Sequence, residues 1–156
     1  SVPDIPFKRG LDAAVEHWRR LVAALERVWV AKNMTIIVID HVAIRNFKDP
    51  TATADYQRIE PSVDRQASAL IQRWCDAVLF ADFKVEVLVT EENKKKTAKA
   101  LGVGERVLHT EHGAAHDGGN RYRLPTVMPL DWPTLAKAIR AGIEENAKAE
   151  EATNAA

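Results

Sequence analysis

The hydrophobic and polar positions along the chain divide it into segments with helix-like and strand-like patterns. Between residues 10 and 32, apolar side chains recur at spacings of three and four, which places them on one face of a helix. The members of this stripe are Leu11, Ala14, Val15, Trp18, Leu21, Val22, Leu25 and Val28. The pattern predicts one long amphipathic helix that ends near Asn33.

The segment MTIIVID, residues 34–40, is apolar at successive positions and rich in β-branched residues. Such a run is typical of a strand buried on both faces, as in a parallel sheet covered by helices. A long helix followed by such a strand favours an α/β architecture. Asp40 and His41 stand at the end of the predicted strand, where open α/β sheets bind ligands. A simple turn at the strand end explains the two residues equally well.

Residues 45–62 show no period and contain Asp-Pro and Glu-Pro turn chemistry, so we expect an irregular loop. A loop of this length in a compact domain is usually functional or mobile. Its basic and aromatic side chains could contact phosphates and stack on bases, although interspersed acidic residues fit a solvated loop equally well. The basic and aromatic residues of the loop and its margins are Arg45, Phe47, Lys48, Tyr56, Arg58 and Arg65.

The remainder of the chain alternates between helical and strand-like patterns. The predicted elements are a helix over 63–75, one or two strands over 77–90, a charged hairpin or loop over 91–99, a strand over 105–111 and a Gly-rich loop over 113–125. Asp131 is the predicted N-cap of a last helix, with Pro133 in its first turn. We expect one domain over residues 1–145 and a disordered or fraying tail over 146–156.

Composition narrows the class of protein without selecting a function. The 156 residues include 22 Lys+Arg and 22 Asp+Glu, so the overall charge gives no argument for nucleic acid. The single cysteine, Cys75, excludes an intrachain disulfide framework and fits a reducing compartment, where it is expected to be a core residue. The longest apolar run is too short to cross a bilayer. These features predict a cytoplasmic protein without a membrane partner.

Two patterns that resemble ligand sites are weak. A P-loop requires G-x4-GK[S/T] between a strand and a helix, and the nearest spacing, in residues 113–120, has Gly119 in place of the essential lysine. His109, His112 and His116 have metal-like spacing, but no second pair of ligands accompanies them. We therefore expect neither a P-loop nor a metal site, and metal analysis of the purified chain would test the latter expectation.

Several segments, taken in order, resemble phage-encoded AAA/RecA-like ATPases of recombination modules. The resemblance covers roughly residues 5–145, and no single piece is diagnostic alone. The segments are TIIVIDHVAIRNFKDP (35–50), ASALIQRWCDAVLFADFKVEV (67–87), GERVLHTE (104–111), GNRYRLP (119–125) and PLDW (129–132).

This resemblance implies a fold and a set of partners. The fold would be the C-terminal part of a RecA-like P-loop NTPase sheet flanked by helices, with a β-hairpin region. The family's P-loop and acidic Walker B strand would lie upstream of Ser1. ATP and Mg²⁺ are implied for the full-length family, whereas this chain alone is expected to bind neither tightly. The resemblance also implies single-stranded DNA as a partner, a homo-oligomer, and a bacterial host cell as the location of a phage or prophage protein.

The resemblance also implies roles for individual residues. His41 falls at the position of a sensor of the terminal phosphate, with Asp40 beside it. Asn120 and Arg121 match a Lys-Asn-Arg motif that can reach a neighbouring subunit's nucleotide, where a cation stabilises the transferring phosphoryl group. By the same resemblance, Arg123 would lie close to the same nucleotide. The DNA-facing loop would present Arg45, Phe47, Lys48, Arg58 and Arg65.

Three positions depart from the family pattern. The motif's lysine is replaced by Gly119, which removes one cation. A glycine is replaced by Arg123, which can alter the loop or partly replace the lost charge. An alanine is replaced by Asp40, an acid that is unfavourable near phosphates unless a cation pairs with it.

Two hypotheses follow from the residues and the resemblance together. The first is the C-terminal half of a RecA-like ATP-binding protein that acts on DNA in recombination or single-strand annealing and is inactive as an ATPase alone. The alternative is a non-catalytic DNA-binding or oligomerisation module that kept the RecA-like sheet.

Overall fold

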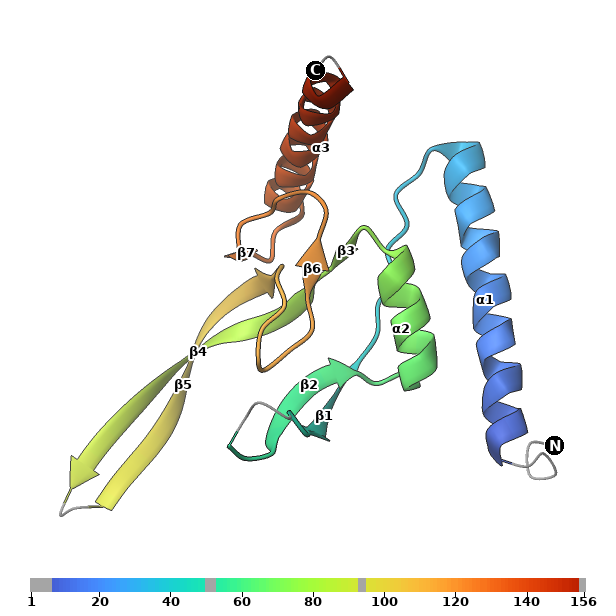
Figure 1. Ribbon diagram of the computed structural model, residues 1–156. Coiled ribbons are helices and arrows are strands. Elements are labelled where there is room, and N and C mark those ends of the chain that lie inside the picture. The colour runs from blue at the N-terminus through green and yellow to red at the C-terminus, as the bar shows by residue number, and fades with distance from the viewer. Residues whose placement is uncertain (1–6, 50–52, 93–94, 155–156) are drawn as a thin grey trace. The chain divides into compact units, whose positions relative to one another are not determined.

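The computed structural model describes residues 7–49, 53–92 and 95–154, which form helices and small antiparallel sheets (Figure 1). The chain divides into an N-terminal unit, Ser1–Cys75, and a C-terminal unit, Asp76–Ala156. The mixed α/β class is confirmed, but every pairing between the described strands is antiparallel rather than parallel. Among the residues described, no helix is both long and apolar enough to cross a membrane.

The N-terminal unit contains two helices, as the apolar periodicity predicts. Helix α1 runs over Phe7–Lys32 and α2 over Arg65–Trp74. Asn33 follows α1 with a φ of 47°, a left-handed conformation that ends helices and that asparagine tolerates. The carboxylate of Asp64 accepts a 2.9 Å hydrogen bond from the backbone N–H of Gln66, which caps the start of α2.

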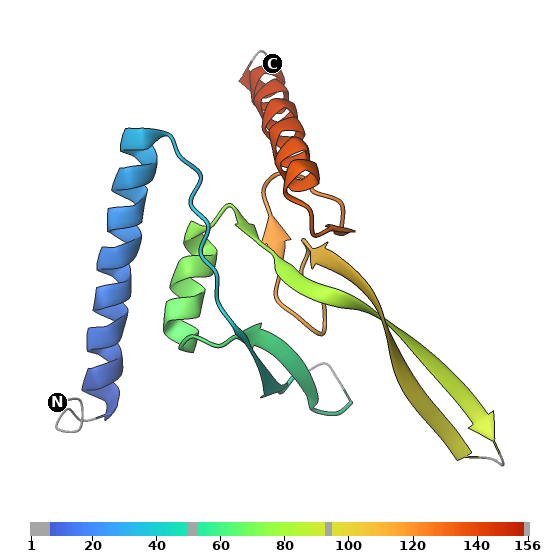
Figure 2. The same cartoon turned by 180° about the vertical axis from the view of Figure 1, so that it is seen from behind.

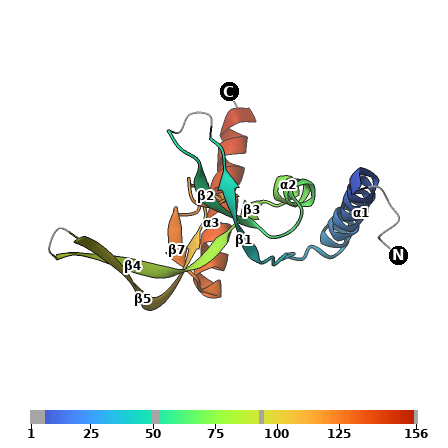
Figure 3. The same ribbon diagram turned by 90° about the horizontal axis from the view of Figure 1, so that it is seen from below.

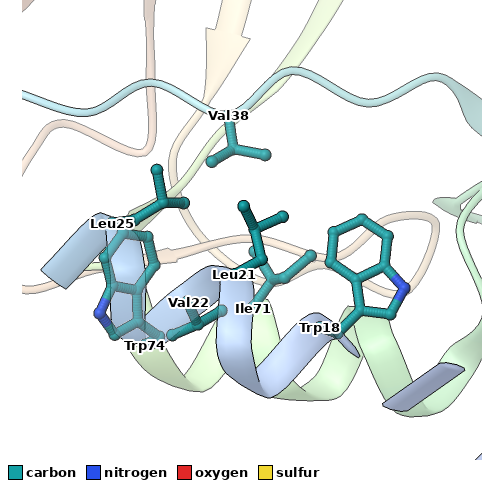
Figure 4. A pocket seen from close by; sticks show the side chains of 7 residues that line it. All are labelled: Trp18, Leu21, Val22, Leu25, Val38, Ile71 and Trp74. Atoms are coloured by element: carbon teal, nitrogen blue, oxygen red, sulfur yellow. The ribbon is translucent and has the colours of Figure 1, made fainter. Parts of the chain in front are cut away.

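The two helices lie side by side (Figures 1 and 2), and an apolar recess opens between them and the segment that follows α1 (Figure 4). From the predicted α1 stripe, Val15 and Val22 are buried, whereas the side chain of Leu11 lies outside the described residues. The residues that line the recess are Trp18, Leu21, Val22, Leu25, Val38, Ile71 and Trp74. None carries a charge, so the recess offers no partner for a phosphate.

The predicted buried strand over residues 34–40 is wrong for the structure described. Residues 34–41 form no strand, and most of their apolar side chains are exposed, with Ile37 at 64% and Ile39 at 90%, whereas Ile36 is half-buried. The physical reason is that a strand needs a partner whose backbone groups complete its hydrogen bonds. No described strand pairs with this segment, so its β-branched residues cannot form the sheet that their sequence favours.

The irregular loop predicted over residues 45–62 is also wrong, since most of it is a β-hairpin. Strand β1, Val42–Phe47, pairs in antiparallel register with β2, Tyr56–Pro61. The hairpin escaped detection because it lacks an apolar–polar alternation. The less exposed positions hold Arg45 and Arg58 beside Ala43 and Phe47, while the apolar Val42 and Ile44 are exposed. The Asp-Pro turn at Pro50 lies outside the described residues.

The C-terminal unit begins with the strands predicted over residues 77–90 and 105–111. Strand β4, Phe80–Glu92, pairs with β5, Lys95–His109, in the long hairpin that Figure 3 shows extending away from α3. Residues 91–99 were predicted as a charged hairpin or a loop, and the pairing of β4 with β5 supports the hairpin, with both strands extending into this segment and residues 93–94 outside the described part. Strand β7, Val127–Pro129, pairs with the end of β5. A second sheet joins β3, Ala77–Val78, to β6, Gly119–Asn120.

The last helix, α3, spans Trp132–Asn154 and thus continues past residue 146. Its predicted N-cap is confirmed, because the Asp131 carboxylate accepts hydrogen bonds from the Thr134 backbone N–H at 2.9 Å and from its hydroxyl at 2.6 Å. The buried core of this unit lies between α3 and the ends of the strands and contains Leu108, Leu124, Met128 and Leu135. This core supports the loop that follows β6.

Candidate functional site

The loop that follows β6 is positioned by strand pairing between distant parts of the chain. In the β3–β6 ladder, Ala77 faces Asn120 and Val78 faces Gly119. One step further along the same register, the backbone N–H of Arg121 donates a 3.0 Å hydrogen bond to the carbonyl of Asp76. The ladder therefore places Arg121 beside Asp76, 45 positions earlier in the sequence.

Asn120 holds the loop from inside with three hydrogen bonds. Its amide group donates to the carbonyl of Thr110 at 3.1 Å. Its oxygen accepts from the backbone N–H groups of Tyr122 at 3.1 Å and Leu124 at 2.9 Å. Thr110 is itself fully buried, and its hydroxyl donates to the carbonyl of Pro125 at 2.8 Å. The geometry thus gives Asn120 a structural task, while its proximity to a nucleotide stays a prediction.

Helix α3 supports the loop from the other side. Gly142 is buried on α3, and an added Cβ there would overlap the carbonyl group of Tyr122. The amide of Asn146 donates a 2.7 Å hydrogen bond to the carbonyl of Arg121. Arg123 adopts a φ of 54° and pairs with Glu145 at 3.7 Å through an exposed guanidinium. The loop backbone is therefore held by β3, Thr110 and α3 together.

The side chain of Arg121 is presented to solvent from this fixed backbone. Its Nη1 lies 3.1 Å from Oδ1 of Asp76, and the two side chains are 65% and 48% exposed. The hydroxyl of Tyr122 is a third polar group beside Arg121 and Asp76. Burial, followed by the charge of Asp76 and a hydrogen bond to its carboxylate, raises the pKa of the Tyr122 hydroxyl above 10.0, with Arg121 opposing the rise.

Asp40 and His41 lie at the junction between the exposed segment and β1. The Asp40 carboxylate accepts hydrogen bonds from the Ser62 hydroxyl at 2.9 Å and the Val63 backbone N–H at 3.1 Å. The backbone carbonyl of His41 accepts a 2.8 Å hydrogen bond from the backbone N–H of Ser62. The imidazole side chain of His41 is exposed. Asp40 thus fastens the end of the hairpin to the start of the β1 strand.

The carboxyl of Asp40 titrates below its ordinary range. Desolvation alone would raise its pKa, but the hydrogen bonds from Val63 and Ser62, and a further contribution from His41, outweigh that effect and lower the pKa below 3.8. A lowered pKa means that the ionised form stabilises the fold. This contribution is present above the unfolded pKa and disappears as the pH falls through the lower folded pKa.

Asp40→Asn is therefore expected to reduce the free energy of unfolding by about 1 kcal/mol at neutral pH, because the amide group cannot accept both hydrogen bonds. The difference from the parent should shrink as the pH falls through the lowered folded pKa of Asp40. Urea denaturation at several pH values measures it, with the exposed Asp55→Asn as the control. A difference that persists unchanged at acidic pH would contradict the stabilising role of the ionised carboxylate.

The predicted DNA-facing residues differ in how far their side chains are engaged within the N-terminal unit. Arg45 donates to the carbonyls of Pro61, Ser62 and Val63 at 3.3–3.5 Å, so its guanidinium holds the hairpin end. Arg58 is buried with its guanidinium 4.8 Å from the Phe47 ring, Lys48 is exposed, and Arg65 is exposed and 3.5 Å from Glu60. DNA binding by these residues stays a prediction.

The histidine cluster packs as rings. His109 and His116 lie 4.7 Å apart between centroids, and both stack on Phe80, at 5.7 Å and 5.0 Å. His112 lies 3.8 Å from the carboxylate of Asp117. Within the described residues, no three His, Cys, Asp or Glu side chains gather in a way that could hold a metal ion.

The described residues fit one part of a nucleotide site and not the rest. Arg121 offers an exposed cation that suits a phosphate oxygen. A cradle for phosphates needs a glycine-rich P-loop, which the 156 residues do not contain. Asp40, which the family resemblance places beside the phosphate sensor, has its carboxylate engaged by Ser62 and Val63.

Sequence reasoning missed three residues that shape the loop. Asp76, Thr110 and Gly142 bind or abut it from β3, the end of β5 and α3. Asp76 and Thr110 carried a signal, because both lie in segments of the family resemblance, 67–87 and 104–111. The pairing of Asp76 with Arg121 depends on the strand register, which a single sequence does not reveal.

Comparison with known proteins identifies the family. A scan against protein-family models matches the AAA domain over residues 2–122, a region that includes both Asp40–His41 and Asn120–Arg121. The searches gave no match among curated proteins or solved structures. Since the matched region covers most of the chain, the protein belongs to the AAA domain family, whose members are P-loop ATPases.

Proposed function

We propose that this chain supplies the phosphate-facing arginine of an AAA ATPase, and that Arg121 acts on nucleotide held by a neighbouring copy in a homo-oligomer. The observation that carries the proposal is that Arg121 combines an exposed side chain with a fixed backbone. Its guanidinium is exposed, while its backbone N–H and carbonyl are held by Asp76 and Asn146. An arginine fixed in this way can stabilise charge on a transferring phosphoryl group without reorganising its backbone.

The exposed segment over residues 34–39 supports the proposal. Its β-branched, apolar residues suit a strand buried on both faces, yet Ile37 and Ile39 are largely exposed in the structure. We propose that this segment pairs with a strand of the phosphate-binding part of the AAA domain. In that sheet His41 would stand at the strand end and sense the terminal phosphate, with its backbone fixed by Ser62.

The proposal is tested by measuring ATP hydrolysis for the isolated 156-residue chain and for the product of the complete reading frame. We expect no turnover by the isolated chain, because it contains no P-loop. We expect turnover by the product of the reading frame, and a loss of roughly 10³-fold in kcat on Arg121→Ala, the magnitude typical of a trans arginine. Arg140→Ala, an exposed arginine on α3, is the control and should leave kcat unchanged.

Two outcomes of this experiment would contradict the proposal. Turnover by the isolated chain that Arg121→Ala abolishes would show a complete site within these residues. Turnover by the reading-frame product that is indifferent to Arg121→Ala would remove the arginine from the reaction. A mixing experiment extends the test, since an inactive Arg121→Ala copy combined with a copy defective in phosphate binding should regain activity only if the arginine acts in trans.

A second candidate function is a non-catalytic module that binds single-stranded DNA or assembles with other copies, as in DNA recombination. Two observations favour it, namely the Gly119 that replaces a cation and the engagement of Asp40 in hairpin contacts. Lys48 and Arg65 would then provide the exposed cations. No ATP turnover from either protein, together with salt-dependent binding to single-stranded DNA that nucleotide does not alter, would select this function over the first.

A further inference from the structure

Asp76 makes three contacts with the two residues that follow Asn120. Its carbonyl accepts from the backbone N–H of Arg121 at 3.0 Å. Its carboxylate lies 3.1 Å from Nη1 of Arg121 and also accepts a hydrogen bond from the hydroxyl of Tyr122. The β3–β6 register creates this arrangement, so one acidic side chain holds both the cation and the phenol.

The contacts of Asp76 differ in strength. An ion pair with half of its surface in water contributes little stability, because solvent screens the charges and both side chains lose freedom. The backbone hydrogen bond belongs to a strand ladder and is supported by the Asn146 bond on the other side of the same residue. A competing anion can therefore take the guanidinium from Asp76 while the backbone of Arg121 stays where it is.

We propose that Asp76 is a positioning residue that occupies the Arg121 guanidinium in the absence of phosphate and yields it to an incoming phosphate group. This inference rests on the proposed function, in which Arg121 contacts phosphate. In the exchange Asp76 keeps its hydrogen bond from Tyr122, so the carboxylate stays in place and can recapture the arginine. The same carboxylate competes with phosphate, and the affinity of Arg121 for phosphate is set by that competition.

The test uses the full 156-residue chain and inorganic tripolyphosphate as the probe, with binding followed by calorimetry or NMR. Removing the competing carboxylate in Asp76→Asn should tighten tripolyphosphate binding by about two- to fivefold, the equivalent of one exposed ion pair. Asp76→Ser, a second variant, should change the affinity in the same direction, and Asp76→Glu should bind as weakly as the parent. Arg121→Ala should abolish the binding.

The matched control is Glu145→Gln, which removes one negative charge beside Arg123 in the same unit. It should leave the affinity within about twofold of the parent, because an exposed charge acts weakly beyond its own partner. If Glu145→Gln tightens binding as much as Asp76→Asn, the effect is one of net charge and the inference is overturned. Weaker or equal binding by Asp76→Asn also overturns it, since a purely structural residue would give that result.

A spectroscopic titration separates failure of this inference from failure of the proposed function. The chain has two tyrosines, so Tyr56→Phe leaves the ionisation of Tyr122 as the sole tyrosinate signal. Because the negative charge of Asp76 raises the pKa of Tyr122, Asp76→Asn should lower that pKa, and Arg121→Gln should raise it. An unchanged pKa in Asp76→Asn overturns the role of Asp76 alone. The expected pKa changes without any tripolyphosphate binding overturn the phosphate role of Arg121, and with it the exchange.

Discussion

Replacing Gly142 by alanine should destabilise the C-terminal unit by about 1–3 kcal/mol, although alanine is the better helix former. In an open helix position the change would stabilise by about 1 kcal/mol. Here the added Cβ would overlap the Tyr122 carbonyl oxygen and lie 2.7 Å from its carbon. Both partners are backbone, so no side-chain rotation relieves the clash, and overpacking of this kind costs about 1–3 kcal/mol or more.

Chemical denaturation of the full chain measures this loss, and hydrogen exchange assigns it to the C-terminal unit. Gly119→Ala is the matched control, because a Cβ at that position meets nothing within 4 Å. The control should change the free energy of unfolding by no more than about 0.5 kcal/mol. A Gly142→Ala variant as stable as the parent would show that α3 does not rest against the loop.

Asn120→Ala should cost about 2–4 kcal/mol, because it breaks three hydrogen bonds that close the same loop. The backbone N–H groups of Tyr122 and Leu124 lose their acceptor, and the carbonyl of the fully buried Thr110 loses a donor. Partly buried groups that lose their partners cost more than exposed groups, which water can satisfy. The free energy of unfolding, measured by denaturation and by hydrogen exchange in the C-terminal unit, gives the value.

Asn146→Ala provides the comparison within the same loop, since it removes the one exposed hydrogen bond to the carbonyl of Arg121. It should cost about 0.5–1 kcal/mol. Equal losses from the two substitutions would contradict the claim that Asn120 is the inner clamp. Together with Gly142→Ala, the pair tests whether the backbone of Arg121 is held firmly enough to present a fixed cation.

The helices and the long hairpin were predictable because their signals are local. The apolar period of three and four predicts helix α1, although of its stripe Val15 and Val22 are buried while Leu21 and Val28 are exposed. Asp131 predicts a helix start because its side chain caps the backbone N–H of Thr134, three residues later. The β1–β2 hairpin was not predictable in the same way. Arg45 and Arg58 turn inward within it, so the apolar alternation that reveals a strand is missing.

In the candidate site too, some features could be predicted from the sequence and others could not. Asn120 and Arg121 were singled out by their resemblance to a motif of phage AAA/RecA-like ATPases, and the family match confirms the AAA domain family alone. Their different tasks were not visible, because the hydrogen bonds of Asn120 reach Thr110 and the ion pair of Arg121 reaches Asp76, 45 positions away. Residues 34–40 show the reverse case, in which a strand was predicted and none is present. Their sequence strongly favours a buried strand, but no strand in the described structure pairs with them.

The sequence by itself determined the helical segments, the strands within residues 77–90 and 105–109, the AAA family and the lack of a P-loop within these residues, since each depends on residues close together or on a motif. Only the tertiary structure decided that Asp76 faces Arg121, that Gly142 abuts Tyr122, and that Asp40 binds Ser62 and Val63. These contacts depend on strand register and helix approach, which bring distant residues within hydrogen-bonding distance and leave no periodic trace in the chain.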